Sequence, residues 1–136
     1  MTLKSQLVIT YLLIFFFTLV LGCRKGPGEG GKASVTGKIK VEYYNWDWSN
    51  LIVEYPAKAE DVYIVFGNST TYNDKTETHY DGTYSFNYLL PGRYELYVYS
   101  KDSTGSADNK VAVIKEFIIL EEDNEIILDD ITIVDN

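Results

Sequence analysis

The sequence predicts an all-β fold, an antiparallel sandwich of about seven or eight short strands. From Lys32 onward, no segment of the 136-residue chain shows the sustained apolar period of about 3.6 residues that marks a helix. Tyr, Val, Ile, Thr and Phe, which favour strands, are the prevailing residue types there. Turn residues recur about every ten positions. Short strands at this spacing are typical of two packed antiparallel sheets.

The first part of this region predicts three strands. Ser34–Tyr44 alternates apolar and polar residues, so we expect a strand with one buried face. Leu51–Glu54 predicts a short edge strand that Pro56 ends, because proline cannot donate to a ladder. Glu60–Phe66 is apolar on both faces and is expected in the middle of a sheet. The polar stretch Asn68–Asn73 then predicts a loop.

Asp81 and Gly82 separate two further runs, Lys75–Tyr80 and Thr83–Tyr88. Both turn residues tolerate positive φ, so the pattern predicts a hairpin between the two runs. Three aromatic side chains of the second run are expected on one face: Tyr84, Phe86 and Tyr88.

Three more strands are expected toward the end of the chain: Arg93–Ser100, Val111–Leu120 and Glu125–Val134. In the first of them, alternation places Tyr94, Leu96 and Val98 on one face, and Tyr97 and Tyr99 on the other. The stretch Lys101–Asn109 between them is polar and predicts a loop.

The first 23 residues predict an export signal and a lipid anchor. Lys4 precedes an apolar run, Leu7–Leu21, which is the pattern of a secretory signal and is short for a membrane span of about 20 residues. At its end, Val20-Leu21-Gly22-Cys23 resembles a bacterial lipobox. The resemblance implies cleavage before Cys23 and acylation of its thiol with fatty acids such as palmitate. A chance Cys after an ordinary signal peptide is the alternative.

We therefore expect three segments: a signal peptide at 1–22, the lipidated Cys and a flexible tether at 23–33, and a folded domain at 34–136. Lipidation of Cys23 implies a protein of the bacterial cell envelope, held on the outer membrane by its acyl chains. The periplasmic face and the cell surface both stay open.

Four sequence blocks follow one another in the pattern of a known domain. They are Val35-Thr36-Gly37-Lys38-Ile39, Glu60-Asp61-Val62-Tyr63-Ile64, Tyr80-Asp81-Gly82-Thr83-Tyr84-Ser85-Phe86 and Leu90-Pro91-Gly92-Arg93-Tyr94-Glu95-Leu96. Together they resemble the carboxypeptidase regulatory-like domain, a transthyretin-like (prealbumin-like) sandwich that also forms the B-type repeats of collagen adhesins. The resemblance covers Ser34 to about Val134 and implies a fold, not a function. Glu42–Ala59 is longer and more aromatic than the family's link between its first two strands.

Composition and charge argue against several classes of function. With 12 basic and 20 acidic residues, the net charge is −8, so we expect no nucleic-acid partner. One Cys and one His provide neither a disulfide framework nor a Cys/His zinc site. His79 lies beside the expected turn, and no nucleophile motif accompanies it, so we expect no enzyme, no catalytic residue, no cofactor and no metal. The loop residues Asp102, Asp108 and Asn109 leave calcium open, although they match no calcium-loop pattern.

The most unusual segment is Tyr43–Asn50, which contains both Trp residues. If this segment were extended, the two indoles would share a face. Indole rings beside amide and carboxylate groups suit stacking on sugars or anchoring a protein contact. The alternative is that the rings pack over an open edge or end of the sandwich. The candidate ligand-binding residues are Tyr44, Trp46, Asp47 and Trp48, with Tyr97 and Tyr99 as a weaker second group.

We therefore expect a non-enzymatic, lipid-anchored envelope protein whose domain binds an envelope protein or a glycan. The alternative is a structural spacer or subunit that pairs with its neighbours through open sheet edges.

Overall fold

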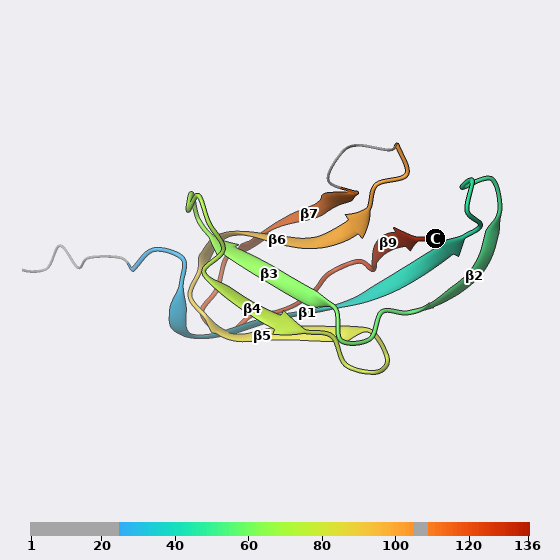
Figure 1. Cartoon of the computed structure of the whole chain (residues 1–136). Coiled ribbons are helices and arrows are strands. Elements are labelled where there is room, and N and C mark those ends of the chain that lie inside the picture. Colours follow the sequence, from blue (N-terminus) through green and yellow to red (C-terminus); the bar gives the residue numbers. More distant parts are fainter. Residues whose placement is uncertain (1–24, 105–108) are drawn as a thin grey trace, which may run out of the picture.

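The computed structural model describes residues 25–104 and 109–136, and these form two stacked β-sheets (Figure 1). One sheet contains β1 (Glu29–Tyr44), β2 (Leu51–Pro56), β5 (Thr83–Leu89), β8 (Glu125–Ile127) and β9 (Ile131–Asp135). The other has the order β4 (Asp74–Glu77), β3 (Asp61–Phe66), β6 (Gly92–Lys101) and β7 (Lys110–Ile119). The described residues contain no helix long and apolar enough to cross a membrane. The expected β-sandwich is confirmed, while Cys23, the signal segment and Asp108 lie outside the described residues.

β1 organises the first sheet because its 16 residues are long enough to pair with two strands on each side. On one side its first part pairs with β5 and its last part with β2, both antiparallel. On the other side it pairs with β8 and then β9, and both of these run parallel to it. The expectation of a purely antiparallel sandwich is therefore wrong at this edge.

The strand count also differs from the expected seven or eight, since nine strands lie within the described residues. The expected last strand, Glu125–Val134, is divided into β8 and β9. Leu128 still donates its N–H to the carbonyl oxygen of Thr36 at 2.9 Å, but the chain then leaves the ladder until Ile131.

The expected hairpin around Asp81 and Gly82 is wrong. β4 pairs with β3 in one sheet, and β5 pairs with β1 in the other. Gly82 does have the positive φ of a tight turn, +80°. Its carbonyl oxygen accepts the N–H of Ile39 at 2.9 Å, and a Cβ at Gly82 would clash with the Ile39 carbonyl oxygen. This close approach fixes the turn against β1, so the turn carries the chain from one sheet to the other.

One aromatic residue of β5 does not lie on the expected face. Tyr84 and Phe86 are buried, but Tyr88 has φ +62° and is 73% exposed. Leu89 is buried in its place. The register between β1 and β5 shifts beside Leu89, so a bulge interrupts the alternation before the strand ends.

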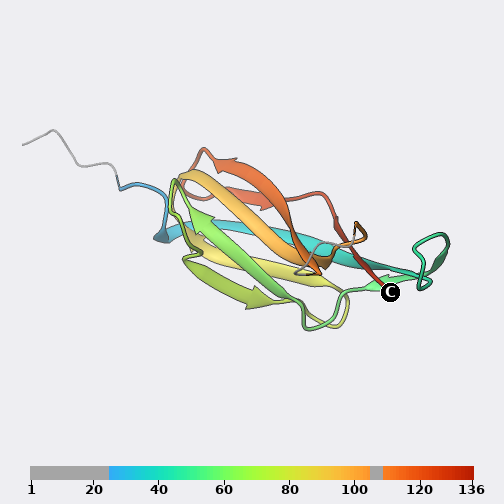
Figure 2. The ribbon, with the colours of Figure 1, turned by 45° about the horizontal axis from the view of Figure 1, so that its top comes forward.

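The turned view shows the two sheets stacked on each other (Figure 2), and the residues of the hydrophobic core come from both sheets. β6 contributes Tyr94, Leu96 and Val98 to it, as expected from alternation, and all three side chains are fully buried. Every residue of the core cluster lies between Ala33 and Ile133. The stretch from Lys25 to Asn136 therefore contains the folded unit.

The segment before β1 is attached to the body rather than hanging free. Gly28 donates its N–H to the Tyr94 hydroxyl at 2.9 Å, and its carbonyl oxygen accepts the N–H of Leu90 at 2.8 Å. Tyr94 in turn donates to the carbonyl oxygen of Leu90 at 2.6 Å. β1 starts at Glu29, within the segment expected to be a tether. We call these contacts of Gly28 with Tyr94 and Leu90 the N-terminal clamp.

At the opposite end, β1 and β2 extend beyond the second sheet (Figures 1 and 2). We call Lys40–Pro56, which comprises the end of β1, the turn and β2, the arm. β2 is an edge strand, as expected, yet all six of its residues are exposed. Within the arm, Val41 of β1 belongs to the core, whereas β2 adds no buried side chain to it.

Candidate functional site

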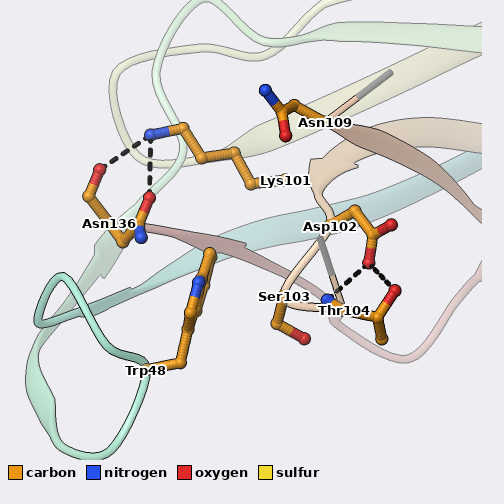
Figure 3. Close-up of a pocket in the computed structure, with 7 residues that line it drawn as sticks. All are labelled: Trp48, Lys101, Asp102, Ser103, Thr104, Asn109 and Asn136. Atoms are coloured by element: carbon orange, nitrogen blue, oxygen red, sulfur yellow. Dashed lines mark hydrogen bonds between the residues drawn. The ribbon is translucent and has the colours of Figure 1, made fainter. Parts of the chain in front are cut away.

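A pocket of about 420 Å³ lies where the arm turn faces the end of β6 (Figure 3). It is lined by Trp48, Lys101, Asp102, Ser103, Thr104, Asn109 and Asn136. Trp48 comes from the arm, Asn109 from just before β7, and Asn136 from the residue after β9. We call this the Trp48 pocket. It brings together three parts of the chain that are far apart in sequence.

The turn of the arm directs Trp48 into this pocket. Trp48 donates its N–H to the carbonyl oxygen of Asn45 at 2.9 Å, and Asn45 donates to the carbonyl oxygen of Asn50 at 3.0 Å. The backbone of Trp48 has φ +62°, which is rare for a bulky side chain and costs about 1–3 kcal/mol. The Tyr44 ring lies beside the indole, with ring centroids 5.9 Å apart. The surrounding turn thus holds a strained residue in place.

Asp47 and Trp46, two of the four predicted ligand-binding residues, do not line the Trp48 pocket. Asp47 accepts hydrogen bonds from the Ser49 N–H at 3.0 Å and the Ser49 hydroxyl at 2.6 Å, and these bonds lower the pKa of its carboxyl group. It therefore stabilises the turn. Trp46 is 86% exposed and does not line the pocket. Because the segment is a turn and not extended, the two indoles do not share a face.

Tyr44 has a supporting position. Its hydroxyl donates to the Glu42 carboxylate at 3.0 Å, and this bond is the main reason that the pKa of Tyr44 is raised. Its ring backs Trp48 but is not among the side chains that line the pocket. Of the four predicted residues, the structure places Trp48 alone in the pocket wall.

The polar wall of the Trp48 pocket contains paired groups. Lys101 Nζ donates to the carbonyl oxygen of Asn136 at 2.7 Å and forms an ion pair with Asp135 at 2.6 Å. Asp102 accepts the Thr104 N–H at 2.7 Å and the Thr104 hydroxyl at 2.6 Å. The lysine charge is thus balanced by a neighbouring carboxylate. The wall offers hydroxyl, amide and carboxylate oxygens opposite one flat indole.

A second pocket of about 280 Å³ adjoins the first and shares Lys101 with it. It opens between the two sheets at the base of the arm, with Tyr55 and Glu60 in its lining. Burial raises the pKa of the Glu60 carboxyl group, against the opposing charge of Lys110.

Tyr97 and Tyr99 lie outside the Trp48 pocket, on the outer face of the second sheet, and Tyr99 also borders the second pocket. Tyr97 stacks on Tyr63 with centroids 4.9 Å apart and planes 10° apart, and Tyr99 meets both rings edge to face. Tyr97 is half-buried and Tyr99 is 42% exposed. Tyr63 and Tyr97 thus each use one ring face in the stack, and the three rings hold one another in place.

Sequence reasoning missed most of the residues that line the Trp48 pocket. Lys101 and Asn136 are 35 positions apart and meet only because β6 and β9 end side by side. No motif marks either residue. The sequence suggests Asp102 and Asn109 as calcium ligands alone. The described residues contain no group of three or more acidic, His or Cys side chains that could hold a metal. The exposed His79 lies outside the pocket.

Comparisons with known proteins give distant structural likenesses only. No family model matches the chain, and no curated protein matches its sequence. A structure described as a "putative carbohydrate binding protein" from Pseudomonas aeruginosa is similar, with 11% identity and a TM-score of 0.46 over 79% of this chain and 90% of that one. An (S)-allantoin synthase is similar with 12% identity and a TM-score of 0.40, over 75% of this chain and 42% of that one. Both TM-scores lie below 0.5, where a likeness does not establish a shared fold.

Proposed function

We propose that this chain is a non-enzymatic, lipid-anchored envelope protein whose domain binds a glycan in the Trp48 pocket. The observation that carries the proposal is the conformation of Trp48. A tryptophan at φ +62° is strained, and strain of this kind concentrates at functional sites. The turn directs the indole into a pocket instead of into the core.

The chemistry of the pocket suits a neutral sugar. An indole offers a flat apolar face for the C–H face of a pyranose ring. Ser103, Thr104 and Asn136 offer hydroxyl and amide groups to its hydroxyls. The charge of Lys101 is balanced by Asp135, so the lining provides no unbalanced cation for an acidic sugar.

The finer family assignment is also a proposal. We propose a carboxypeptidase regulatory-like sandwich on the strength of the four sequence blocks, which fall in β1, β3, at the start of β5 and in β6. These four strands supply most of the core residues. Such a domain serves as a scaffold, so its function depends on the site and not on the fold.

The lipid anchor proposed at Cys23 would orient the domain, and with it the Trp48 pocket, relative to the membrane. The N-terminal clamp begins at Gly28, so five residues span at most about 18 Å between the anchor and the body. The clamp lies at the end of the body opposite the arm (Figures 1 and 2). We therefore propose that the clamped end stands near the bilayer and that the Trp48 pocket points away from it.

Brominated phospholipids test this orientation, because they quench only those indoles that approach the acyl chains. The acylated protein in such vesicles is expected to keep the full emission of Trp46 and Trp48. Quenching of either indole would show that the arm lies on the membrane.

Binding is tested with the chain from Lys25 to Asn136 against insoluble peptidoglycan and a panel of soluble neutral polysaccharides, by pull-down and calorimetry. Trp48→Gly removes the indole and also relieves the positive φ. We expect at least a tenfold loss of affinity, with a melting temperature equal to or above that of the natural chain.

Trp46→Ala is the matched control, because it removes the other indole of the same turn from an exposed position. It is expected to bind as the natural chain does. If Trp48→Gly retains full binding, or if no glycan of the panel is bound, the proposal is wrong.

A further inference from the structure

The second pocket, which adjoins the Trp48 pocket at Lys101, reaches the hydrophobic core. We call it the Lys110 pocket. Three buried core residues line it: Val41, Ala57 and Ile133. Its volume is about 280 Å³. Small-molecule sites combine an apolar lining with a few polar groups, and their volumes begin at about 300 Å³, so this pocket suits a small ligand.

The segment that brings Lys58 and Glu60 to this pocket is held by a buried threonine. The Thr78 hydroxyl donates to the carbonyl oxygen of Ala57 at 2.7 Å and accepts the N–H of Glu60 at 2.9 Å. Between these two bonds Ala59 has φ +55°, a left-handed conformation that is uncommon for a residue with a side chain. Strained backbone of this kind concentrates at functional sites. Thr78 thus fixes the backbone from which Lys58 and Glu60 line the pocket.

Another part of the lining joins the two sheets. Val134 of β9 donates its N–H to the buried hydroxyl of Ser100 in β6 at 2.9 Å, although these strands belong to different sheets. The next residue of β6 is Lys101, whose Nζ forms an ion pair with Asp135 at 2.6 Å and donates to the carbonyl oxygen of Asn136 at 2.7 Å. This part of the lining is therefore fixed, and its charges are balanced.

The charges that line the Lys110 pocket leave one positive charge in excess. Three lysines and two carboxylates line it, and the ion pair balances Lys101 with Asp135. Lys58, Lys110 and Glu60 remain. Within the described part of the chain, neither Lys58 nor Lys110 forms an ion pair. Because the whole chain has a net charge of −8, this local excess is unusual, and a ligand with one carboxylate would balance it.

We propose that the Lys110 pocket binds an acidic sugar, with Lys58 and Lys110 at its carboxylate, beside the neutral sugar of the Trp48 pocket. The inference rests on the glycan binding proposed above, and it makes the ligand an oligosaccharide in which a neutral sugar adjoins a uronic acid. Ammonium groups donate charge-assisted hydrogen bonds to a carboxylate, and the Glu60 carboxylate can accept from hydroxyls of the same sugar. Lys101 lines both pockets, so the two sugars lie on either side of it.

Oligosaccharides of hyaluronan and of unsulfated chondroitin test this inference, because in both a neutral N-acetylhexosamine alternates with glucuronic acid. Each is compared by calorimetry with the same oligosaccharide after reduction of its carboxyl groups to alcohols, which removes the charge and keeps the rings. With the chain from Lys25 to Asn136, we expect at least one acidic form to bind about tenfold more tightly than its reduced form at low salt. The difference should shrink at about 0.5 M salt, which screens the charges.

Two variants each remove one lysine charge from the pocket, Lys58→Gln and Lys110→Gln. Each should weaken binding of the acidic form about two- to fivefold and leave binding of the reduced form unchanged, because the reduced form has no carboxylate. Lys32→Gln is the matched control, since it makes the same change in net charge at an exposed position near the start of β1, outside both pockets. All three variants should keep the melting temperature of the natural chain.

The outcomes separate this inference from the proposed function. Equal affinity for the acidic and reduced forms, or equal losses in Lys32→Gln and Lys110→Gln, would overturn the acidic-sugar pocket and leave neutral-sugar binding at Trp48 in place. Carboxylate-dependent binding that persists in Trp48→Gly would support the acidic-sugar pocket and overturn the proposed site at Trp48. If no oligosaccharide binds in either form, both proposals are wrong.

Discussion

β6 and β2 are built from similar side chains and have opposite surroundings. Tyr94, Leu96 and Val98 of β6 are fully buried, whereas Leu51 and Val53 of β2 are nearly half exposed. Both strands are rich in residues that favour sheets. The difference lies in what faces them, since β6 faces the other sheet and β2 extends past its end. Apolar composition therefore predicts that a segment forms a strand. Whether the side chains of that strand are buried depends on whether the other sheet lies opposite them.

The residues that stabilise the fold and the residues proposed to bind a ligand lie in different parts of the molecule. The body contains the core and the N-terminal clamp, while the arm carries the Trp48 turn and the open edge of β2. A local opening of β2 would expose little apolar surface that is not already exposed. We expect substitutions in the body to change global stability, and substitutions in the arm to change local order or binding.

The largest effect is expected at Leu96, which is fully buried between the sheets. Leu96→Ala removes buried methyl groups and leaves a cavity, so the free energy of unfolding should fall by about 2–5 kcal/mol. Urea denaturation followed by circular dichroism measures it. A loss below about 1 kcal/mol would mean that the two sheets are not packed as described.

The next largest effect concerns Tyr84 at high pH. This ring is 1% exposed, its hydroxyl has no hydrogen-bond partner among the described residues, and burial raises its pKa to about 12. The folded state therefore holds the proton more tightly than the unfolded state, where the pKa is about 10. The resulting stability is complete below pH 10 and is lost as the pH rises from about 10 to about 12.

Tyr84→Phe removes the hydroxyl group whose ionisation causes this loss of stability. The variant should equal or exceed the natural chain in stability at pH 7, because it deletes an unpartnered buried hydroxyl. Between about pH 10 and 12, the free energy of unfolding of the variant should fall less than that of the natural chain, and the difference should reach about 2–3 kcal/mol. Urea titrations at several pH values measure this, with the exposed Tyr80→Phe as the control. Parallel curves for Tyr84→Phe and the natural chain would contradict the prediction.

Local patterns predicted the strands well and their pairing poorly. Ser34–Tyr44 and Arg93–Ser100 could be predicted because alternation is a property of each strand alone. The Asp81-Gly82 turn has the expected positive φ at Gly82, yet it joins two sheets because Gly82 bonds to Ile39, 43 positions away. No short-range pattern contains that bond.

The residues of the Trp48 pocket could also be predicted only in part from local sequence patterns. The two Trp residues drew attention to the arm, but their roles depend on the turn conformation, which places Trp48 in the pocket and leaves Trp46 outside. Lys101 and Asn136 complete the pocket through the neighbouring ends of β6 and β9. Residue type could predict a candidate segment, and only the tertiary fold could supply the opposite wall.

A smaller effect is expected in the arm turn at acid pH. Ser49 donates two hydrogen bonds to Asp47 and lowers its pKa. The carboxylate therefore supports the turn above the ordinary Asp pKa, and this support is lost as the pH falls through the lowered value. In a Trp46→Phe background, Trp48 emission should shift to the red on acidification while the body stays folded.

Asp47→Ala should show that red-shifted emission already at pH 7, because the acceptor is gone. Asp47→Asn is the conservative comparison, since its side-chain oxygen still accepts from Ser49. An acid-induced shift that persists unchanged in Asp47→Ala would place its origin in another group.

The smallest effect is expected at Ile52, the arm counterpart of Leu96. At low micromolar concentration Ile52→Ala should change the free energy of unfolding by less than about 0.5 kcal/mol, because the side chain is mostly in water before and after folding. Urea denaturation of both variants under one set of conditions gives the contrast directly. A large cost would instead mean that β2 packs on the body of its own chain, and the contrast between β6 and β2 would disappear.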